Sequence, residues 1–395
     1  MRKPTAVQPG IRPTGLGVIV RSRGLWSLAL VFTSLVATLA VCEVGLRTYH
    51  LIMARWRRAP VEEIVLDNNL GWRATENYRF AGNLRDRDGT LYWADVRTDR
   101  RGFRVFGDAT KTNRPKVLFL GDSFTHAVQV SAQDAYYSLV GRALDIEVFA
   151  YGAGGWGTLQ ELMILPDFLD LIQPDAVVLQ LCSNDIYNND FELERGSARN
   201  NNGLVRPYWE DGTIVRRLPR RFATLRRFAS RYSEFLYFVF SRLDRIVAAS
   251  DRRGFEDRVE EEGLHFAPFS EAASVTEQLL REIRQVVPSG VPVFAFCTDD
   301  PESVFGVLRS ASDKAGLIFI EGVPESLRKA ENRGVCTRAA DGGHWSPDGH
   351  RVVAEVLVEF FEQRWSMRQE TNVRYEASDV GIPTFHSSST STGKS

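Results

Sequence analysis

The chain has 395 residues, of which 44% are hydrophobic and 25% charged, which are ordinary proportions for a globular protein. These values exclude a mostly disordered chain, a collagen-like fibre and a polytopic membrane protein, and four cysteines are too few for a disulfide scaffold. The formal net charge of -1 gives no support for nucleic-acid binding, which needs a basic surface. Residues 1–60 carry a net charge of +8 and the remainder -9, so we expect the N-terminal part to serve targeting or membrane contact.

An uncharged apolar run extends from Leu25 to Cys42, after a basic leader over residues 1–24 that we expect to be flexible and cytoplasmic. At about 1.5 Å per residue the run spans about 27 Å, close to the thickness of a bilayer core. We therefore predict a transmembrane signal anchor over residues 25–46, although arginines on both sides weaken the positive-inside assignment. A cleaved signal peptide and a buried core helix are the alternatives. The anchor leaves the rest of the chain outside the cytoplasm.

After the anchor, residues 47–110 are rich in Arg, Asp, Gly and aromatic residues and predict loops with short strands. Residues 111–185 and 263–368 then alternate between short apolar runs and helical patterns. The runs, apolar on both faces, predict buried parallel strands at Val117–Leu120, Ile146–Ala150, Ala176–Leu181, Val293–Phe296 and Leu317–Ile320. Helices are expected near Asp134–Leu144, Thr158–Ile172, Glu271–Val287 and Glu302–Lys314, with a last one from Ser346-Pro347-Asp348. This alternation predicts a three-layer α/β/α fold with a five-stranded parallel sheet.

Residues 186–262 interrupt the alternation and are expected to form an inserted, lid-like segment. A basic, aromatic helix is predicted within it around Ala223–Ile246. This helix fits three roles: a solvated helix with an apolar face on the core, a lid, or a helix on the membrane surface. The Ser/Thr-rich tail over residues 369–395 lacks apolar periodicity and predicts disorder.

Two motifs carry the candidate chemistry. Gly121-Asp122-Ser123 directly follows the first strand of the predicted sheet, which is where α/β folds bind their ligands, although Asp and Ser are also ordinary capping residues. Asp341 precedes His344 by three residues in the loop before the last helix. Its carboxylate can accept a hydrogen bond from one imidazole nitrogen while the other nitrogen faces a nucleophile.

Two turns lie between these motifs in the chain, at the same edge of the predicted sheet. Gly152 belongs to a glycine-rich turn after the second strand, and Ser183-Asn184-Asp185 follows the third. A glycine N–H and an asparagine amide placed side by side can bind an oxyanion.

In this order, the four pieces resemble the SGNH (GDSL) hydrolase family, and Leu70-Gly71-Trp72 and Gly102-Phe103-Arg104 resemble its membrane-tethered bacterial members. The resemblance extends over about residues 66–365 and implies a flavodoxin-like α/β/α fold. It implies a single-pass protein of the bacterial cell membrane whose catalytic domain faces the periplasm or the exterior. By this resemblance Ser123 is the nucleophile, His344 the general base and Asp341 its orienting carboxylate. The oxyanion hole comprises the Ser123 and Gly152 N–H groups and the Asn184 side chain, and neither a cofactor nor a metal is implied.

The expected function is hydrolysis of an acyl ester, in particular an O-acetyl ester, through an acyl-enzyme. The expected substrate is an acetylated carbohydrate or a cell-envelope polymer. An O-acyltransferase that modifies an exported polysaccharide shares the same intermediate and remains an alternative, as does a non-catalytic carbohydrate-binding scaffold.

Two further interpretations have less support. Gly152-x-Gly154-x-x-Gly157 matches a dinucleotide fingerprint, but the nearest acid, Asp175, precedes the next strand instead of following it. A metal site built from Asp341, His344, Asp348 and His350 leaves the Gly-Asp-Ser motif unexplained, and for His350 we favour a packing role.

Overall fold

The computed structural model describes residues 16–56, 62–110, 113–197, 199–219, 232–236, 238–240, 242–243, 255–298 and 302–379. The chain forms two compact units. Unit 1 consists of Met1–Pro60 and Phe222–Asp251, and unit 2 of Val61–Arg221 and Arg252–Ser395.

Unit 1 is built on one long helix, α1, from Leu16 to Trp56. Its segment Trp26–Ile52 is long and apolar enough to cross a membrane, and none of its residues is fully buried. A signal sequence would fit the same description. Residues 16–24 of the expected flexible leader are helical, because they continue the helix that the apolar run forms, and residues 1–15 lie outside the described residues. The predicted helix Ala223–Ile246 is described only in part, over residues 232–236, 238–240 and 242–243, where most residues are helical.

Unit 2 contains a six-stranded sheet in the order β12-β11-β8-β6-β7-β5. The five predicted parallel strands are confirmed as β6 Lys116–Gly121, β7 Glu147–Gly152, β8 Ala176–Leu181, β11 Val293–Cys297 and β12 Ile318–Ile320. The sixth strand, β5 Val105–Phe106, pairs antiparallel with β7 at one edge. Its two residues are too few to produce a recognisable alternation of apolar and polar positions, and for this reason the sequence does not predict it.

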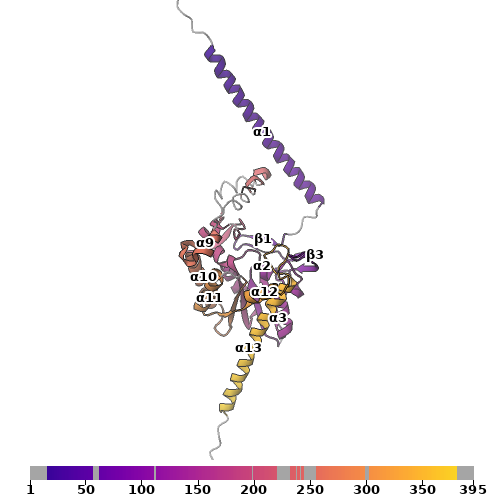
Figure 1. Ribbon diagram of the computed structural model, residues 1–395, viewed down its shortest axis with the longest axis vertical. Helices are drawn as coiled ribbons and strands as arrows, with labels where there is room; N and C mark the ends of the chain where they lie inside the picture. Colours follow the sequence, from indigo (N-terminus) through magenta and orange to yellow (C-terminus); the bar gives the residue numbers. More distant parts are fainter. Residues whose placement is uncertain are drawn as a thin grey trace, which may run out of the picture. The chain divides into compact units, whose positions relative to one another are not determined.

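Helices cover both faces of this sheet, so the three-layer α/β/α fold is confirmed (Figure 1). One face carries α4 Thr158–Ile172, α10 Ala267–Val286 and α11 Glu302–Lys314; the other carries α3 Tyr136–Leu144, α12 Val323–Asn332 and α13 Pro347–Asp379. Along β6, Leu118 and Leu120 belong to the first core and Val117 and Phe119 to the second. This alternation is that of a strand buried on both faces.

Helix α13 is longer than the sequence pattern predicts. It continues to Asp379, whereas disorder is expected from residue 369; residues 380–395 lie outside the described residues. Figure 1 shows α13 running on beyond the sheet. The segment 368–370 is Arg-Gln-Glu, all good helix formers, and extending an existing helix requires no new nucleus. The helix therefore continues through residues 369–379 although they lack apolar periodicity.

The remaining strands of unit 2 form antiparallel hairpins. Two precede the sheet and one lies in the insertion: β1 Ile64–Asp67 with β2 Gly71–Ala74, β3 Arg79–Arg85 with β4 Leu91–Arg97, and β9 Arg206–Glu210 with β10 Thr213–Arg217. The short helices are α2 Ser123–His126, α5 Ser183–Asn189, α6 Phe191–Gly196 and α9 Phe255–Glu262, with 3-10 turns at Ala132–Asp134 and Gly263–His265.

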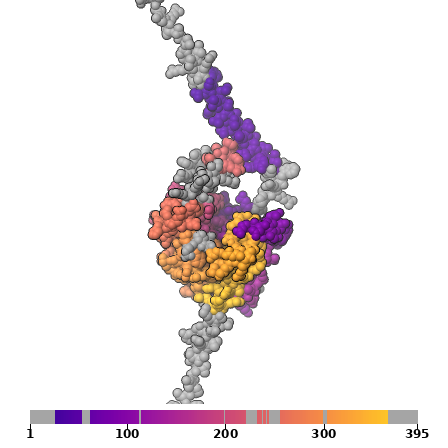
Figure 2. Space-filling view, viewed as in Figure 1, coloured from indigo at the N-terminus to yellow at the C-terminus, as the bar shows by residue number. Residues whose placement is uncertain are grey.

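The β3–β4 hairpin lies beside the segment that leads into the Asp341 loop. The Ala340 N–H donates to the Arg85 carbonyl at 3.0 Å, and the Arg87 N–H donates to the Arg338 carbonyl at 3.0 Å. Figure 2 shows the purple hairpin against orange-yellow atoms. Residues early in unit 2 thus support a loop that is close to its C-terminal end.

A buried ion pair connects β9 to the loop after β7. The Arg206 Nε lies 2.8 Å from Glu194 Oε2, and both side chains are almost completely buried. Arg206 also donates to the Gly155 carbonyl at 2.7 Å, and its guanidinium stacks over the Trp72 ring at 4.6 Å. The Tyr208 hydroxyl donates to the same Glu194 oxygen at 2.8 Å. This arginine therefore links the insertion, the β1–β2 hairpin and the sheet edge.

Replacing Arg206 by Met leaves Glu194 as a buried carboxylate without its cation, so we expect the free energy of unfolding to fall by about 3–5 kcal/mol. Denaturant unfolding of Arg206→Met measures the loss. The control is Arg195→Met, which removes the exposed partner of Glu192 and should change stability by less than about 0.5 kcal/mol. Equal stabilities for the two variants would contradict this role for Arg206.

Candidate active site

Ser123 is the first residue of α2, in the sharp turn that leaves β6, and its side chain is half-buried. The Asp122 carboxylate caps this turn by accepting the Phe124 N–H at 2.9 Å. From the neighbouring strand β8, Gln180 Oε1 accepts the N–H groups of Asp122 at 3.2 Å and Thr125 at 3.1 Å. The turn is therefore held by the strand next to it.

Asp341 and His344 form a hydrogen-bonded pair in the loop before α13. Asp341 Oδ2 lies 2.8 Å from His344 Nδ1, and Oδ1 accepts the N–H groups of Gly343 and His344, both at 2.9 Å. These contacts fix the ring so that Nε2 faces away from the carboxylate. Burial lowers the pKa of His344, but the hydrogen bond and charge of Asp341 outweigh it, and the net pKa lies above its ordinary value. The hydrogen bond from His344 holds the pKa of Asp341 far below its usual range.

The structure brings this pair next to the Ser123 turn. The His344 ring packs on the Phe124 ring with centroids 5.2 Å apart, and Phe124 packs on Trp345 at 4.6 Å. The Ser123 hydroxyl makes no hydrogen bond to another described residue. Hydrogen bonds between nucleophile and base are often long without substrate and tighten when it binds. The arrangement thus places a serine and an Asp-His pair at one edge of the sheet.

Gly152 ends β7 directly opposite Gly121 of β6. A Cβ at Gly152 would lie 2.4 Å from the Asp122 carbonyl oxygen and 2.6 Å from the His126 backbone nitrogen. Only glycine permits the two chains to approach this closely. The predicted site residue Gly152 therefore lies against the turn that carries Ser123.

Asn184 lies in α5, just after β8, and is buried. Its Nδ2 donates to the Trp156 carbonyl at 2.7 Å, and its Oδ1 contacts Cys182 Sγ. One of the two amide hydrogens is thus used to hold the loop after β7. Asn184 brings the ends of β7 and β8 together at the edge that carries Ser123.

Behind Ser123 lies a buried group of possible metal ligands, Asp122, Cys182 and Asp185. Cys182 Sγ donates to Asp122 Oδ2 at 2.9 Å, and the Cys182 N–H donates to Asp185 Oδ2 at 2.8 Å. The Thr158 hydroxyl donates to Asp185 Oδ1 at 2.9 Å. Each of the four carboxylate oxygens accepts a hydrogen bond from a protein group, and these bonds connect the ends of β6 and β8 with α4.

Two alternative interpretations of the sequence do not match the geometry. His350 is buried, its Nδ1 accepts the Tyr136 N–H at 3.3 Å, and burial lowers its pKa to about 3, which confirms a packing role. Asp348 pairs with Arg351, so these side chains do not converge on Asp341 and His344. Asp175 accepts the Lys116 N–H at 2.8 Å at the amino end of β6, the edge opposite the glycine loop. Asp175 is therefore not placed to bind a ribose beside the glycine loop, as the dinucleotide interpretation requires.

Glu63 is a site residue that the sequence does not reveal. It precedes β1, and the β1–β2 hairpin is fixed to the glycine loop because Trp72 Nε1 donates to the Gly154 carbonyl and Trp156 Nε1 to the Trp72 carbonyl, both at 2.9 Å. Glu63 Oε1 lies 3.9 Å from the position of a Cβ at Gly154. Burial raises its pKa, and the charges of His344 and Arg104 lower it in part. No short-range sequence pattern marks such a residue, because its place depends on the hairpin.

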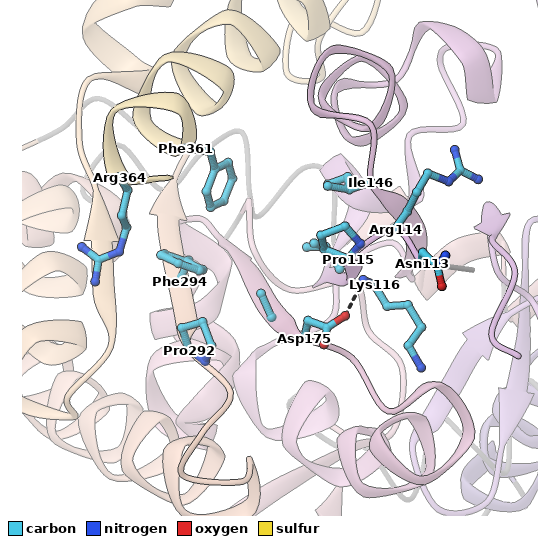
Figure 3. Close-up of a pocket in the computed structure, with 12 residues that line it drawn as sticks. Asn113, Arg114, Pro115, Lys116, Ile146, Asp175, Pro292, Phe294, Phe361 and Arg364 are labelled. Carbon is cyan, nitrogen blue, oxygen red and sulfur yellow. Dashed lines mark hydrogen bonds between the residues drawn. The ribbon is translucent and has the colours of Figure 1, made fainter. Parts of the chain in front are cut away.

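A cavity of about 550 Å³ lies elsewhere, at the amino ends of β6, β8 and β11. Figure 3 shows Phe294 and Phe361 on one side and Pro115 and Ile146 on the other. It is on the opposite edge of the sheet from Ser123 and takes no part in the candidate active site.

No family model matches the chain, and no curated protein matches it. Solved structures do match. An alpha/beta hydrolase enzyme from the metagenome of Lake Arreo is 14% identical, covering 64% of this chain and 97% of its own, with a TM-score of 0.36. A GDSL-like lipase from Parabacteroides merdae is 13% identical over 64% of this chain and 97% of its own, with a TM-score of 0.34. An acetylxylan esterase from Geobacillus stearothermophilus is 12% identical over 64% of this chain and 95% of its own, with a TM-score of 0.34. The chain is similar to these structures at low sequence identity.

The Asp341–His344 pair yields a prediction that does not depend on any activity. In Asp341→Asn the imidazolium loses its anionic partner while burial still disfavours charge, so the pKa of His344 should fall. NMR titration of ring signals in histidine-labelled full-length protein measures this, and the chain has only six histidines to assign. Asp348→Asn, in the same segment but paired with Arg351, is the control and should leave the His344 titration unchanged. An unaltered His344 pKa in Asp341→Asn would contradict the pairing.

Proposed function

We propose that the chain is a membrane-anchored serine esterase of the SGNH type, with Ser123, His344 and Asp341 as its triad. The observation that carries the proposal is the Asp341–His344 pair packed on Phe124, next to the serine turn. The position of Ser123 supports it, because β6 lies between β7 and β8, where the strand order reverses and doubly wound folds bind ligands. The apolar helix α1 is the proposed anchor, with unit 2 on the periplasmic or outer side.

In the proposed reaction, Ser123 Oγ attacks the ester carbonyl carbon and His344 Nε2 takes the hydroxyl proton. Asp341 holds the imidazole in the required tautomer and stabilises the imidazolium. The oxyanion is bound by the Ser123 and Gly152 N–H groups and the Asn184 amide, at about 3–4 kcal/mol of barrier lowering per donor. His344 then protonates the leaving alkoxide, which leaves an acyl-serine. Water, deprotonated by His344, attacks this ester and releases the carboxylic acid.

The proposed substrate is an O-acetylated carbohydrate or cell-envelope polymer. Glu63 supports this choice, because its half-buried carboxylate has no hydrogen-bond partner among the described residues and can accept hydrogen bonds from sugar hydroxyls. Arg104 already offsets part of its charge, which favours a neutral donor over a cation. A substrate hydroxyl at this position would be bound beside the glycine loop.

Ser123→Ala removes the nucleophile, so kcat for p-nitrophenyl acetate should fall by about 10³-fold or more while the thermal unfolding midpoint stays the same. Ser274→Ala, whose hydroxyl bonds only within α10, is the control and should keep full activity. Adding an oligosaccharide acceptor shows whether acetyl passes to water or to sugar. Undiminished turnover by pure Ser123→Ala would overturn the proposed triad.

Glu63→Gln should raise KM for an acetylated oligosaccharide by about tenfold, because a charged acceptor is replaced by a neutral one, and leave KM for p-nitrophenyl acetate unchanged. Glu62→Gln alters the adjacent exposed carboxylate and is the matched control. If both substrates responded equally to Glu63→Gln, the residue would not contact the carbohydrate part.

A further inference from the structure

Three polar side chains share one face of α1 where its apolar run ends. Glu43, Arg47 and His50 are spaced four and three residues apart, which places them along one side of a helix. Glu43 directly follows the uncharged run Leu25–Cys42, at a level where an unpaired carboxylate next to lipid is costly. Its side chain is only 21% exposed, so something in unit 1 covers it.

The covering residues belong to the inserted part of unit 1. Glu43 Oε2 accepts the Ser233 hydroxyl at 2.8 Å and the Phe235 N–H at 2.9 Å, and Oε1 accepts the Glu234 N–H at 3.1 Å. Arg47 donates to the Tyr232 carbonyl at 2.9 Å. The carboxylate thus satisfies N–H groups at the start of a helical stretch, a position where negative charge is favourable.

We give the name docked segment to the described residues 232–236, 238–240 and 242–243. Large apolar side chains stay exposed along it, between 37% and 59%: Tyr232, Leu236, Phe238 and Leu243. Over residues 220–246 the sequence has seven arginines and only two acids, Glu234 and Asp244. Aromatic and apolar side chains combined with an excess of arginine are typical of helices that lie in the interface of anionic membranes.

We propose that the docked segment is a membrane-surface element with an anionic lipid bilayer as its partner. Glu43 holds the start of the docked segment at the end of the apolar run. When α1 spans the membrane, the end of this run lies at the bilayer surface. The exposed aromatic and apolar side chains enter the headgroup region, and the excess of arginine in this part of the sequence favours anionic lipid. The inference rests on the proposed anchoring by α1 and extends it, because it makes the insertion a second membrane contact.

The test uses the full-length chain in phosphatidylcholine vesicles that contain a nitroxide-labelled lipid, with or without phosphatidylglycerol. Leu236→Cys carries a fluorophore in a background where Cys42 and Cys336 are replaced by Ser, since Cys182 and Cys297 are buried. The control label replaces Ile214 of β10, which has the same 37% exposure as Leu236. We expect quenching at position 236 to exceed that at 214 at least about twofold, and to increase with phosphatidylglycerol.

Adding Glu43→Ala should reduce quenching at position 236 to the level at 214, whereas Thr38→Ala, whose hydroxyl bonds only within α1, should have no effect. Equal quenching at 236 and 214 in protein that floats with the vesicles would overturn the membrane contact and leave the anchor intact. If quenching at position 236 did not change in Glu43→Ala, the docking would be overturned. If it did not change with phosphatidylglycerol, the anionic partner would be overturned. Protein that fails to float would overturn the anchor and this inference together.

Discussion

The close approach of two strand ends is the constraint on which the candidate active site depends. Gly121 and Gly152 lie opposite each other where β6 and β7 end, and a Cβ on Gly152 would collide with the Asp122 carbonyl. The turn that carries Ser123 therefore packs against the end of β7 on one side, and on the other side its N–H groups donate to Gln180 of β8. A serine held from both neighbouring strands has little freedom to move, and such preorganisation suits the nucleophilic role that we propose for Ser123.

Segments from outside the α/β alternation complete this edge. Trp72 and Trp156 exchange hydrogen bonds between the β1–β2 hairpin and the glycine loop, and Arg206 of the insertion stacks on Trp72 while it binds Gly155. The β3–β4 hairpin supports the loop that contains Asp341. The region before the sheet is therefore part of the candidate site. This explains how Glu63, which precedes β1, comes to lie at the glycine loop.

The sequence predicts features whose cause is local. The five parallel strands are apolar on both faces, and the spacing of Asp341 and His344 is enough to place them in hydrogen-bond contact, because both properties depend on a few neighbouring residues. Features that depend on distant contacts are not predicted. Strand β5 exists through pairing with β7, and the place of Glu63 depends on the hairpin. Glu43 directly follows the apolar run, and its partners Ser233 and Phe235 lie far along the chain. The continuation of α13 has a different cause, because it depends on propagation from the helix before it.

The carboxyl groups at the site have pKa values that their environments shift in opposite directions. Burial raises the pKa of Asp122, and it raises that of Glu161 well above the ordinary value, because Glu161 is fully buried near Asp122 and Asp185. The half-exposed Asp341 instead has its pKa lowered by the His344 hydrogen bond. The pKa values of the buried carboxyl groups behind Ser123 are thus shifted upward, whereas that of Asp341 is shifted downward. The lowered pKa keeps the Asp341 charge next to the imidazole, where it stabilises an imidazolium. The two kinds of environment exist in one fold because the Asp341 loop is half-exposed and the network behind the sheet edge is buried.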